Sequence, residues 1–273
     1  MSVKLVAVDL DGTLLNEKGI VTDVTKAAID RAQKRGVTVA FCTGRTLAET
    51  RPVIEQLPQV RYAVTTTCGR ILNLHTDEYL GGVRLDADLA RSLAERLREH
   101  EAFFAVMADG EVYSDEAHFV FAKSIFSEAA YLFHRAVYTV VDDVHALLRE
   151  RTDPIEKLFF IFRDKEARDA AWPCVQDAPC YIACSGANNI ELTAIGADKG
   201  RGLQILADHL GIAREETCAI GDNINDLEML QYAGLAVAMG NATPDTKKCA
   251  DIIAPTNRED GVAWVLDHLE ELV

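Results

Sequence analysis

The chain has 273 residues, 49% of them apolar and 26% charged, and its formal net charge is −15. This length suits two domains better than one hydrophobic core, and the acidic excess argues against nucleic acid or an anionic membrane as partner. No apolar stretch approaches the roughly 20 residues that span a bilayer, and seven cysteines, an odd number, favour reduced thiols. We therefore expect a cytoplasmic protein. The sequence does not indicate its oligomeric state.

The first predicted element is a buried strand over residues 4–8, which ends on Asp9-Leu10-Asp11-Gly12-Thr13. A short continuous apolar run is typical of a strand that is covered on both faces. Carboxylates at its end need water, a cation or hydrogen-bond partners, and two of them suit Mg²⁺, which also binds substrate phosphate. Taken alone, the motif is equally typical of a strand followed by a polar turn.

A second predicted strand covers residues 37–42 and ends on Thr43-Gly44-Arg45. The following interval, from residue 46 to residue 197, is too long for one crossover connection and predicts an inserted α+β domain. We expect a Rossmann-like α/β core formed by residues 1–80 and 190–273, with a parallel sheet, and an insert formed by residues 81–189.

The insert shows its own pattern of helices and strands. The residues Asp109-Gly110 are a strong hairpin signal. In the weakest region, residues 114–141, four phenylalanines can form either the buried face of a helix or a substrate-facing lip, and we favour the buried helix. The expected helices are 86–100, 143–150 and 165–176, the expected strands are 102–107, 111–113, 157–162, 181–183 and 190–192, and the phenylalanines are Phe119, Phe121, Phe126 and Phe133.

Beyond the insert, Asp198-Lys199-Gly200 opens an amphipathic helix, and a strand over residues 217–221 ends on Asp222. Asn225 and Asp226 follow closely. A lysine at a helix start is usually a solvated surface residue, but ligands of open parallel sheets bind at the carboxyl ends of the strands. We therefore expect these groups to meet the residues that follow the first two strands in one crevice.

Such a crevice has the groups that phosphoryl transfer requires. A metal held by Asp9, Asp222 and the Asp11 backbone would neutralise charge on phosphate, while Thr43, Gly44 and Lys199 hold the other oxygens. The Asp9 carboxylate can then attack phosphorus and form an aspartyl-phosphate. Asp11 is close enough to exchange protons with the leaving group and with water.

These motifs resemble those of the haloacid dehalogenase superfamily, and specifically of its Cof-type phosphatases. The four matching segments are residues 9–15, 43–45, 199–200 and 221–226. The tail is also similar to a Cof-type ending, through residues 233–242, 250–251 and 259–263. The resemblance covers both ends of the chain, in order, and leaves the middle poorly matched.

The resemblance implies a role for each matching residue, with Mg²⁺ as cofactor. It makes Asp9 the nucleophile and a Mg²⁺ ligand, Asp11 the acid/base and a ligand through its carbonyl, and Asp222 the third ligand. The implied phosphate contacts are the backbone amides of Leu10 and Gly44 and the side chains of Thr43, Lys199 and Asn225. Asp226 is implied to orient the neighbouring residues. The resemblance also makes the insert a cap that closes over the crevice and reads the leaving group.

Specificity residues are harder to choose from the sequence. Candidate readers of the leaving group are His118, Lys123, Arg70 and Asn188, each of which is also typical of an ordinary surface position, and Glu191 is a candidate tie between cap and core. The chain departs from its relatives at Cys68-Gly69, where they usually have Asn-Gly. The amide lost there puts the family's substrate contacts at this loop in doubt.

The function expected from the sequence is that of a Mg²⁺-dependent phosphatase of small phosphorylated metabolites, such as sugar phosphates or phosphorylated cofactors. A phosphomutase or phosphotransferase of the same superfamily is an alternative, because it would use the same aspartyl-phosphate. A catalytically idle metabolite-binding regulator is a third, but this would be attractive only if a catalytic residue were missing.

Overall fold

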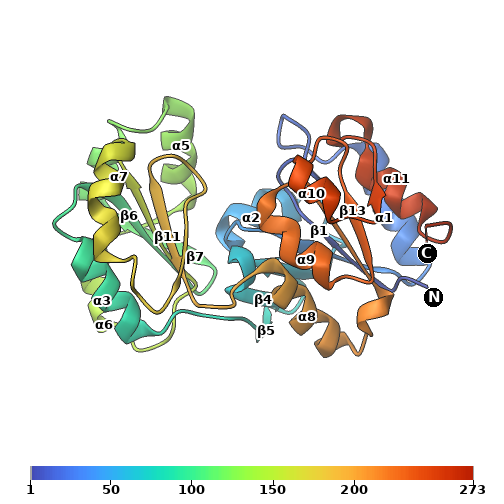
Figure 1. Cartoon of the computed structure of the whole chain (residues 1–273), viewed down its shortest axis with the longest axis horizontal. Coiled ribbons are helices and arrows are strands. Elements are labelled where there is room, and N and C mark those ends of the chain that lie inside the picture. The colour runs from blue at the N-terminus through green and yellow to red at the C-terminus, as the bar shows by residue number, and fades with distance from the viewer. Residues whose placement is uncertain (1, 273) are drawn as a thin grey trace. The chain divides into compact units, whose positions relative to one another are not determined.

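A mostly parallel sheet of eight strands holds the two ends of the chain together in the computed structural model, which describes residues 2–272 (Figure 1). Strand β1 (Leu5–Val8) lies at its centre, between β12 (Thr217–Gly221) and β2 (Thr38–Cys42), and is parallel to both. All four β1 residues are buried, so the predicted strand covered on both faces is confirmed.

The remaining strands extend this sheet on both sides. On one side lie β13 (Leu235–Ala238) and β14 (Ile252–Ile253), and on the other lie β3 (Tyr62–Thr65), β4 (Arg70–Asn73) and β5 (Glu78–Gly81), with the pairings β3–β4 and β4–β5 antiparallel. The parallel strands end at one edge of the sheet, which brings the segments after β1, β2 and β12 together.

The helices of this part come from both ends of the chain. They are α1 (Asp23–Lys34), α2 (Leu47–Ile54), α8 (Lys199–Leu210), α9 (Leu227–Tyr232), α10 (Pro244–Lys248) and α11 (Gly261–His268). Helix α8 lies very close to β3, because a β-carbon on Gly202 would overlap the Val64 side chain. Within the first turn of α8, Lys199, Gly200 and Gly202 are buried.

A second, separate sheet has six strands in mixed orientation. Its strands, in spatial order, are β10 (Tyr181–Ala183), β11 (Asn189–Thr193), β9 (Lys157–Phe162), β6 (Ala102–Ala108), β7 (Glu111–Asp115) and β8 (Thr139–Val141). The predicted hairpin joins β6 and β7, and both Asp109 and Gly110 have the positive φ angles that a two-residue hairpin turn requires. The expected α/β architecture with a second mixed sheet is confirmed.

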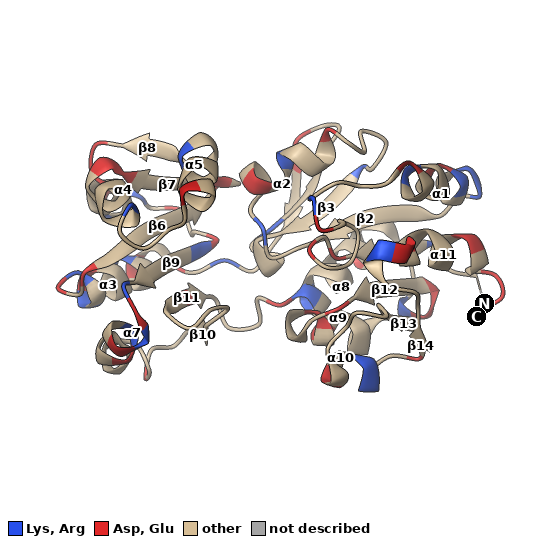
Figure 2. Ribbon diagram, turned by 90° about the horizontal axis from the view of Figure 1, so that it is seen from above, with Lys and Arg blue, Asp and Glu red and all other residues tan. Residues whose placement is uncertain are grey.

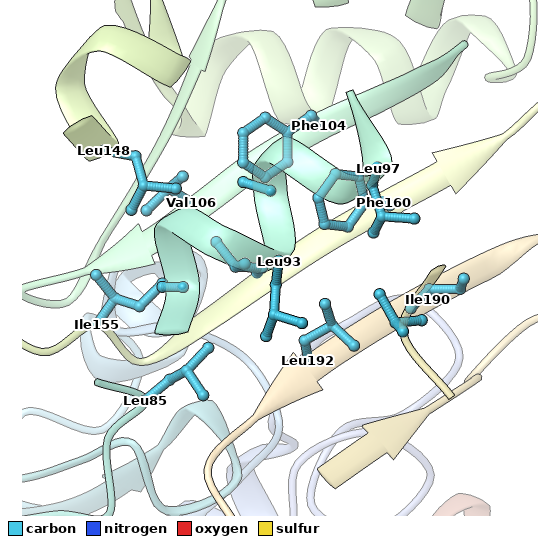
Figure 3. Packing of buried hydrophobic residues seen from close by; sticks show 14 of the residues in the cluster. Leu85, Leu93, Leu97, Phe104, Val106, Leu148, Ile155, Phe160, Ile190 and Leu192 are labelled. Carbon is cyan, nitrogen blue, oxygen red and sulfur yellow. The ribbon is translucent and has the colours of Figure 1, made fainter. Parts of the chain in front are cut away.

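One face of the second sheet is covered by α3 (Ala87–Leu97), α6 (Val144–Glu150) and α7 (Lys165–Ala171) (Figure 3). There Phe104 stacks on Phe160 with 4.5 Å between ring centroids. Side chains alternate along a strand, so Phe103 points to the opposite face, where it packs on α4 (Glu116–Ala122).

The region from residue 114 to residue 141 contains two helices, α4 and α5 (Glu128–Val137). On α4, Phe119 is completely buried and Phe121 packs against the same cluster, which confirms the helix-core interpretation for these two. Phe126 also packs against this cluster, but from the turn between α4 and α5. Phe133 differs, because 42% of it is exposed on α5. The helix predicted over 165–176 is also too long: α7 ends at Ala171, and a 3₁₀ turn follows at the Pro-containing segment Trp172–Cys174.

The contacts divide the chain into two units. The first, called here the core unit, comprises the residues up to Arg45, Thr50–Gly82 and the residues from Asp198 on; the inserted unit comprises Thr46–Glu49 and Val83–Ala197. The inserted unit continues past the return point expected near residue 189, because β11 pairs with β9 and β10 in the second sheet. Charged residues lie mainly on helices and loops (Figure 2), and over residues 2–272 no helix is long and apolar enough to cross a membrane.

We predict that Phe104→Ala destabilises the inserted unit by about 3–5 kcal/mol, because it leaves a cavity in a packed core. Phe133→Ala, the matched control on the exposed part of α5, should cost less than about 1 kcal/mol. Urea unfolding of both variants, followed by circular dichroism, measures the difference. Similar midpoints for the two would contradict the packing described for Phe104.

Candidate active site

Lys199 is at the centre of the residues that meet at the edge of the parallel sheet. Its side chain is completely buried, and its Nζ donates to Asp9 Oδ1 at 2.5 Å and to Asp226 Oδ1 at 2.6 Å. Burial alone would lower the pKa of this lysine, but the carboxylates of Asp9 and Asp226 raise it above its ordinary value. Lys199 is therefore a charged internal residue and not the solvated lysine of the alternative interpretation.

Asp226 uses both of its carboxylate oxygens within the protein. Oδ1 accepts from Lys199, and Oδ2 accepts from the amides of Asp222 and Asn223 at 2.8 and 2.9 Å. The residue is fully buried. Asp226 thus connects the loop after β12 to the buried lysine.

Asp9 and Asp222 each have one carboxylate oxygen that accepts no hydrogen bond from residues 2–272. The engaged oxygens are Asp9 Oδ1, bound to Lys199, and Asp222 Oδ1, which accepts from Thr13 Oγ1 at 2.9 Å. Burial raises the pKa of Asp222 to about 6. Burial also raises the pKa of Asp9, against the opposing effect of Lys199.

These carboxylates fit a hard divalent cation. Asp9, Asp222 and Asp226 each place a ligand oxygen within 4.8 Å of the others, and with Asp11 they make four carboxylates near two cations, Lys199 and Arg45. Uncompensated negative charge and free carboxylate oxygens are what Mg²⁺ requires. Both oxygens of Asp226 already accept from protein donors, whereas Asp9 and Asp222 each keep one oxygen without a donor, so Asp9 and Asp222 are better suited to hold the ion.

Gly12 allows this arrangement because of its backbone and its lack of a side chain. Its φ is +81°, and a β-carbon there would overlap the carboxylate of Asp222. The turn after β1 therefore brings the segment Asp9–Thr13 against the loop after β12 only with glycine at this position. Any larger residue would push the two segments apart.

Two backbone amides near the carboxylates are also without a partner. The N–H groups of Leu10 and Gly44 donate to no acceptor in the described part of the chain, although the side chain of Leu10 is fully buried. Thr43 Oγ1 accepts from the Arg45 amide at 3.1 Å and keeps its own proton available. Unsatisfied donors beside a cationic group are suited to an anion such as phosphate.

Arg45 holds Asp11 in a two-pronged ion pair that the sequence did not reveal. Its Nε lies 2.7 Å from Asp11 Oδ2, and a terminal guanidinium nitrogen lies 2.5 Å from Oδ1. Asn225, also predicted as a phosphate contact, is exposed, and its side chain forms no hydrogen bond within residues 2–272.

The candidate specificity residues have local structural partners. Their contacts are His118 Nδ1 with Asp115 at 2.7 Å, Asn188 Nδ2 with the Phe162 carbonyl at 2.6 Å, Lys123 over the Tyr131 ring, Arg70 over the Tyr79 ring, and Glu191 with Lys157, Ser185 and Asn189. All contacts of Glu191 lie inside the inserted unit. Cys68, where relatives usually have asparagine, is completely buried.

An α/β fold with an inserted second sheet and a carboxylate–lysine centre defines a hydrolase that handles phosphate esters. The family model described as haloacid dehalogenase-like hydrolase matches residues 6–266, and the chain belongs to this family. It is a phosphatase of the Cof type, subclass IIB, that is, a phosphoric monoester hydrolase, and its second sheet forms the cap domain.

Individual relatives match over almost the whole chain. It is 31% identical to phosphatase YwpJ of Bacillus subtilis, over 98% of this chain and 100% of that one. It is also 31% identical to the B. subtilis protein named 5-amino-6-(5-phospho-D-ribitylamino)uracil phosphatase YcsE, over 98% and 96%. A haloacid dehalogenase-like hydrolase from Bacteroides thetaiotaomicron has a similar crystal structure, with a TM-score of 0.84, 26% identity, and coverage of 98% and 100%.

We predict that Mg²⁺ binds at least about tenfold more weakly at pH 5 than at pH 8. With its pKa raised to about 6, Asp222 is mostly protonated at pH 5, and a protonated carboxyl group is a poor metal ligand. Asp9, whose pKa burial also raises, adds to this loss. Raising the pH removes these protons, so affinity should rise with pH. Calorimetric titration with Mg²⁺ measures the change, and Asp222→Asn should show a smaller pH dependence than the wild type. Equal wild-type affinities at the two pH values would contradict the assignment.

Proposed function

We propose that this protein hydrolyses small phosphorylated metabolites, with Mg²⁺ as cofactor, through an aspartyl-phosphate formed on Asp9. The observation that carries the proposal is the surroundings of Asp9: a carboxylate with one free oxygen, held by a buried lysine beside two amides that lack an acceptor. A nucleophile, a fixed positive charge and an anion cradle at one sheet edge are the requirements of phosphoryl transfer.

In the proposed reaction, an Asp9 oxygen forms a bond to phosphorus while the bond from phosphorus to the leaving oxygen breaks. Asp11 gives a proton to that oxygen. A water molecule then attacks the phosphorus, Asp11 takes the water's proton, and inorganic phosphate leaves with the Asp9 carboxylate restored. When bound, Mg²⁺ would supply positive charge that neutralises a phosphate oxygen.

The proposal assigns the other residues to binding. The amides of Leu10 and Gly44 and the side chains of Thr43, Lys199 and Asn225 hold the phosphate oxygens, while Asp222 and the Asp11 carbonyl complete the metal site with Asp9. Asp11 must leave its pair with Arg45 to reach the substrate.

The substrate class is proposed to be a sugar phosphate or a phosphorylated cofactor precursor. One supporting observation is that three relatives that match over at least 96% of this chain carry the name 5-amino-6-(5-phospho-D-ribitylamino)uracil phosphatase. A phosphomutase would use the same intermediate, and it differs in passing the phosphoryl group to a second sugar. An idle regulator is not supported, because Asp9, Asp11, Lys199 and Asp222 are all present.

We predict that Asp9→Asn abolishes turnover and leaves the fold intact, because the amide keeps the shape of the side chain but is a very poor nucleophile. Phosphate release by the purified variant should fall below about a hundredth of the wild-type rate. Asp245→Asn, on the exposed helix α10, is the matched control and should keep full activity. Retention of several per cent of activity in Asp9→Asn, free of contaminating phosphatase, would rule out Asp9 as the nucleophile.

We also predict that a panel of phosphorylated metabolites contains substrates with kcat/KM well above that of p-nitrophenyl phosphate, because remote binding energy is used at the reacting centre. The panel should include 5-amino-6-(5-phospho-D-ribitylamino)uracil and hexose and pentose phosphates, each assayed with Mg²⁺ and with chelator. Transfer of phosphoryl groups to an added sugar, in place of phosphate release, would favour the phosphomutase instead.

A further inference from the structure

Two asparagines from the C-terminal part of the core unit bind the turn that follows β1. Asn241 Nδ2 donates to the Gly12 carbonyl at 2.7 Å, and Asn257 Nδ2 donates to the Leu15 carbonyl at 2.9 Å. More than 220 positions of sequence separate the partners of each bond. The turn that carries Asp11 is therefore held by side chains from the far end of the chain.

The two asparagines are also joined to each other. The Asn257 amide N–H donates to Asn241 Oδ1 at 3.0 Å. This bond fixes which side of the Asn241 amide faces the turn, since its oxygen is taken and its nitrogen is left to donate. The donor aimed at Gly12 is thus oriented by a backbone group and not by packing alone.

The loop that carries Asn241 is itself fixed to the metal-site loop. The Met239 amide donates to the Gly221 carbonyl at 3.0 Å, and the Thr243 amide donates to the Asp222 carbonyl at 2.9 Å. Asn241 lies between these two anchors. Asn241 therefore connects the loop of Asp222 with the turn of Gly12. The hydrogen bond from Thr13 Oγ1 to Asp222 Oδ1 is a second link between the same two segments.

We propose that Asn241 is a positioning residue for the metal site, and this inference rests on the proposed function. Its bond to the Gly12 carbonyl fixes the peptide plane between Gly12 and Thr13, and so restrains a glycine that has φ +81° and no side chain. Asp11, whose carbonyl is a proposed ligand, directly precedes Gly12 in the chain. Thr13, whose hydroxyl donates to Asp222, directly follows it.

Without the Asn241 bond, the Gly12–Thr13 peptide keeps only the long bond from the Thr13 amide to the Leu10 carbonyl, at 3.4 Å. The Asp11 carbonyl and the Thr13–Asp222 hydrogen bond are then held less firmly in one direction. The ligands remain present but are less well organised before the ion binds. The cost falls on metal affinity more than on folding, because Asn241 is exposed and buries little surface. One exposed hydrogen bond corresponds to about a fivefold change in an equilibrium constant.

The test compares Asn241→Leu with Gln33→Leu. Both substitutions remove a side-chain amide donor from a backbone carbonyl, but Gln33 donates to the Gln59 carbonyl at 3.1 Å, and neither residue belongs to the proposed site. Mg²⁺ alone is titrated into each purified protein by calorimetry, and melting temperatures are recorded in chelator. Asn241→Leu should weaken Mg²⁺ binding about fivefold and raise the Mg²⁺ concentration for half-maximal activity equally. Gln33→Leu should leave both unchanged.

If Asn241→Leu binds Mg²⁺ as tightly as the wild type, the positioning role is wrong, whatever its melting temperature. Asn241→Ala, which also removes the donor and adds no bulk, replaces the leucine variant if that variant does not fold. The outcome is separable from the proposed function. An inactive Asp9→Asn together with unchanged Mg²⁺ binding in Asn241→Leu overturns only this inference, whereas an active Asp9→Asn overturns the nucleophile.

Discussion

The buried ion pairs of Lys199 are the interaction on which the rest of the core unit depends. Removing an ammonium group from water costs several kcal/mol, and here two carboxylates, from Asp9 and Asp226, compensate for it. Each partner belongs to a different segment: the end of β1, the first turn of α8 and the loop after β12. A shift of any one would leave a buried charge unpaired, so the three segments hold one another in place.

The same electrostatics prepares the site for a cation and an anion in adjacent positions. Lys199 satisfies one oxygen of Asp9, and Thr13 satisfies one oxygen of Asp222, which leaves one oxygen on each. Burial makes these carboxylates harder to ionise, as the raised pKa values of both show. A divalent cation would stabilise the ionised forms, and the free amides beside them suit an oxyanion. The groups are fixed before substrate arrives, which is the basis of electrostatic catalysis.

The sequence predicted those parts of the structure that depend on local pattern. The apolar runs before Asp9 and Asp222 predicted the central strands, and Asp109-Gly110 predicted the hairpin. Each of these signals is contained in a few consecutive residues. The pair of Asp11 with Arg45 and the bond from Asn241 to Gly12 could not be predicted, since both depend on side-chain directions set by the folded backbone. Helix α7 ended early, before Pro173, because proline has no amide N–H to continue the helical hydrogen bonds.

The division of labour between the two units follows from where the chemical groups lie. Every residue assigned to the nucleophile, the metal and the phosphate comes from the core unit, on segments joined by buried ion pairs and backbone hydrogen bonds. The inserted unit has its own apolar cluster around Phe104 and Leu93 and needs none of those groups to fold. Residues on the surface of the inserted unit can therefore be substituted without removing any of the groups assigned to phosphoryl transfer. Because the groups of the catalytic centre act only on the phosphate and the metal, the chemistry of Asp9 leaves the identity of the substrate open.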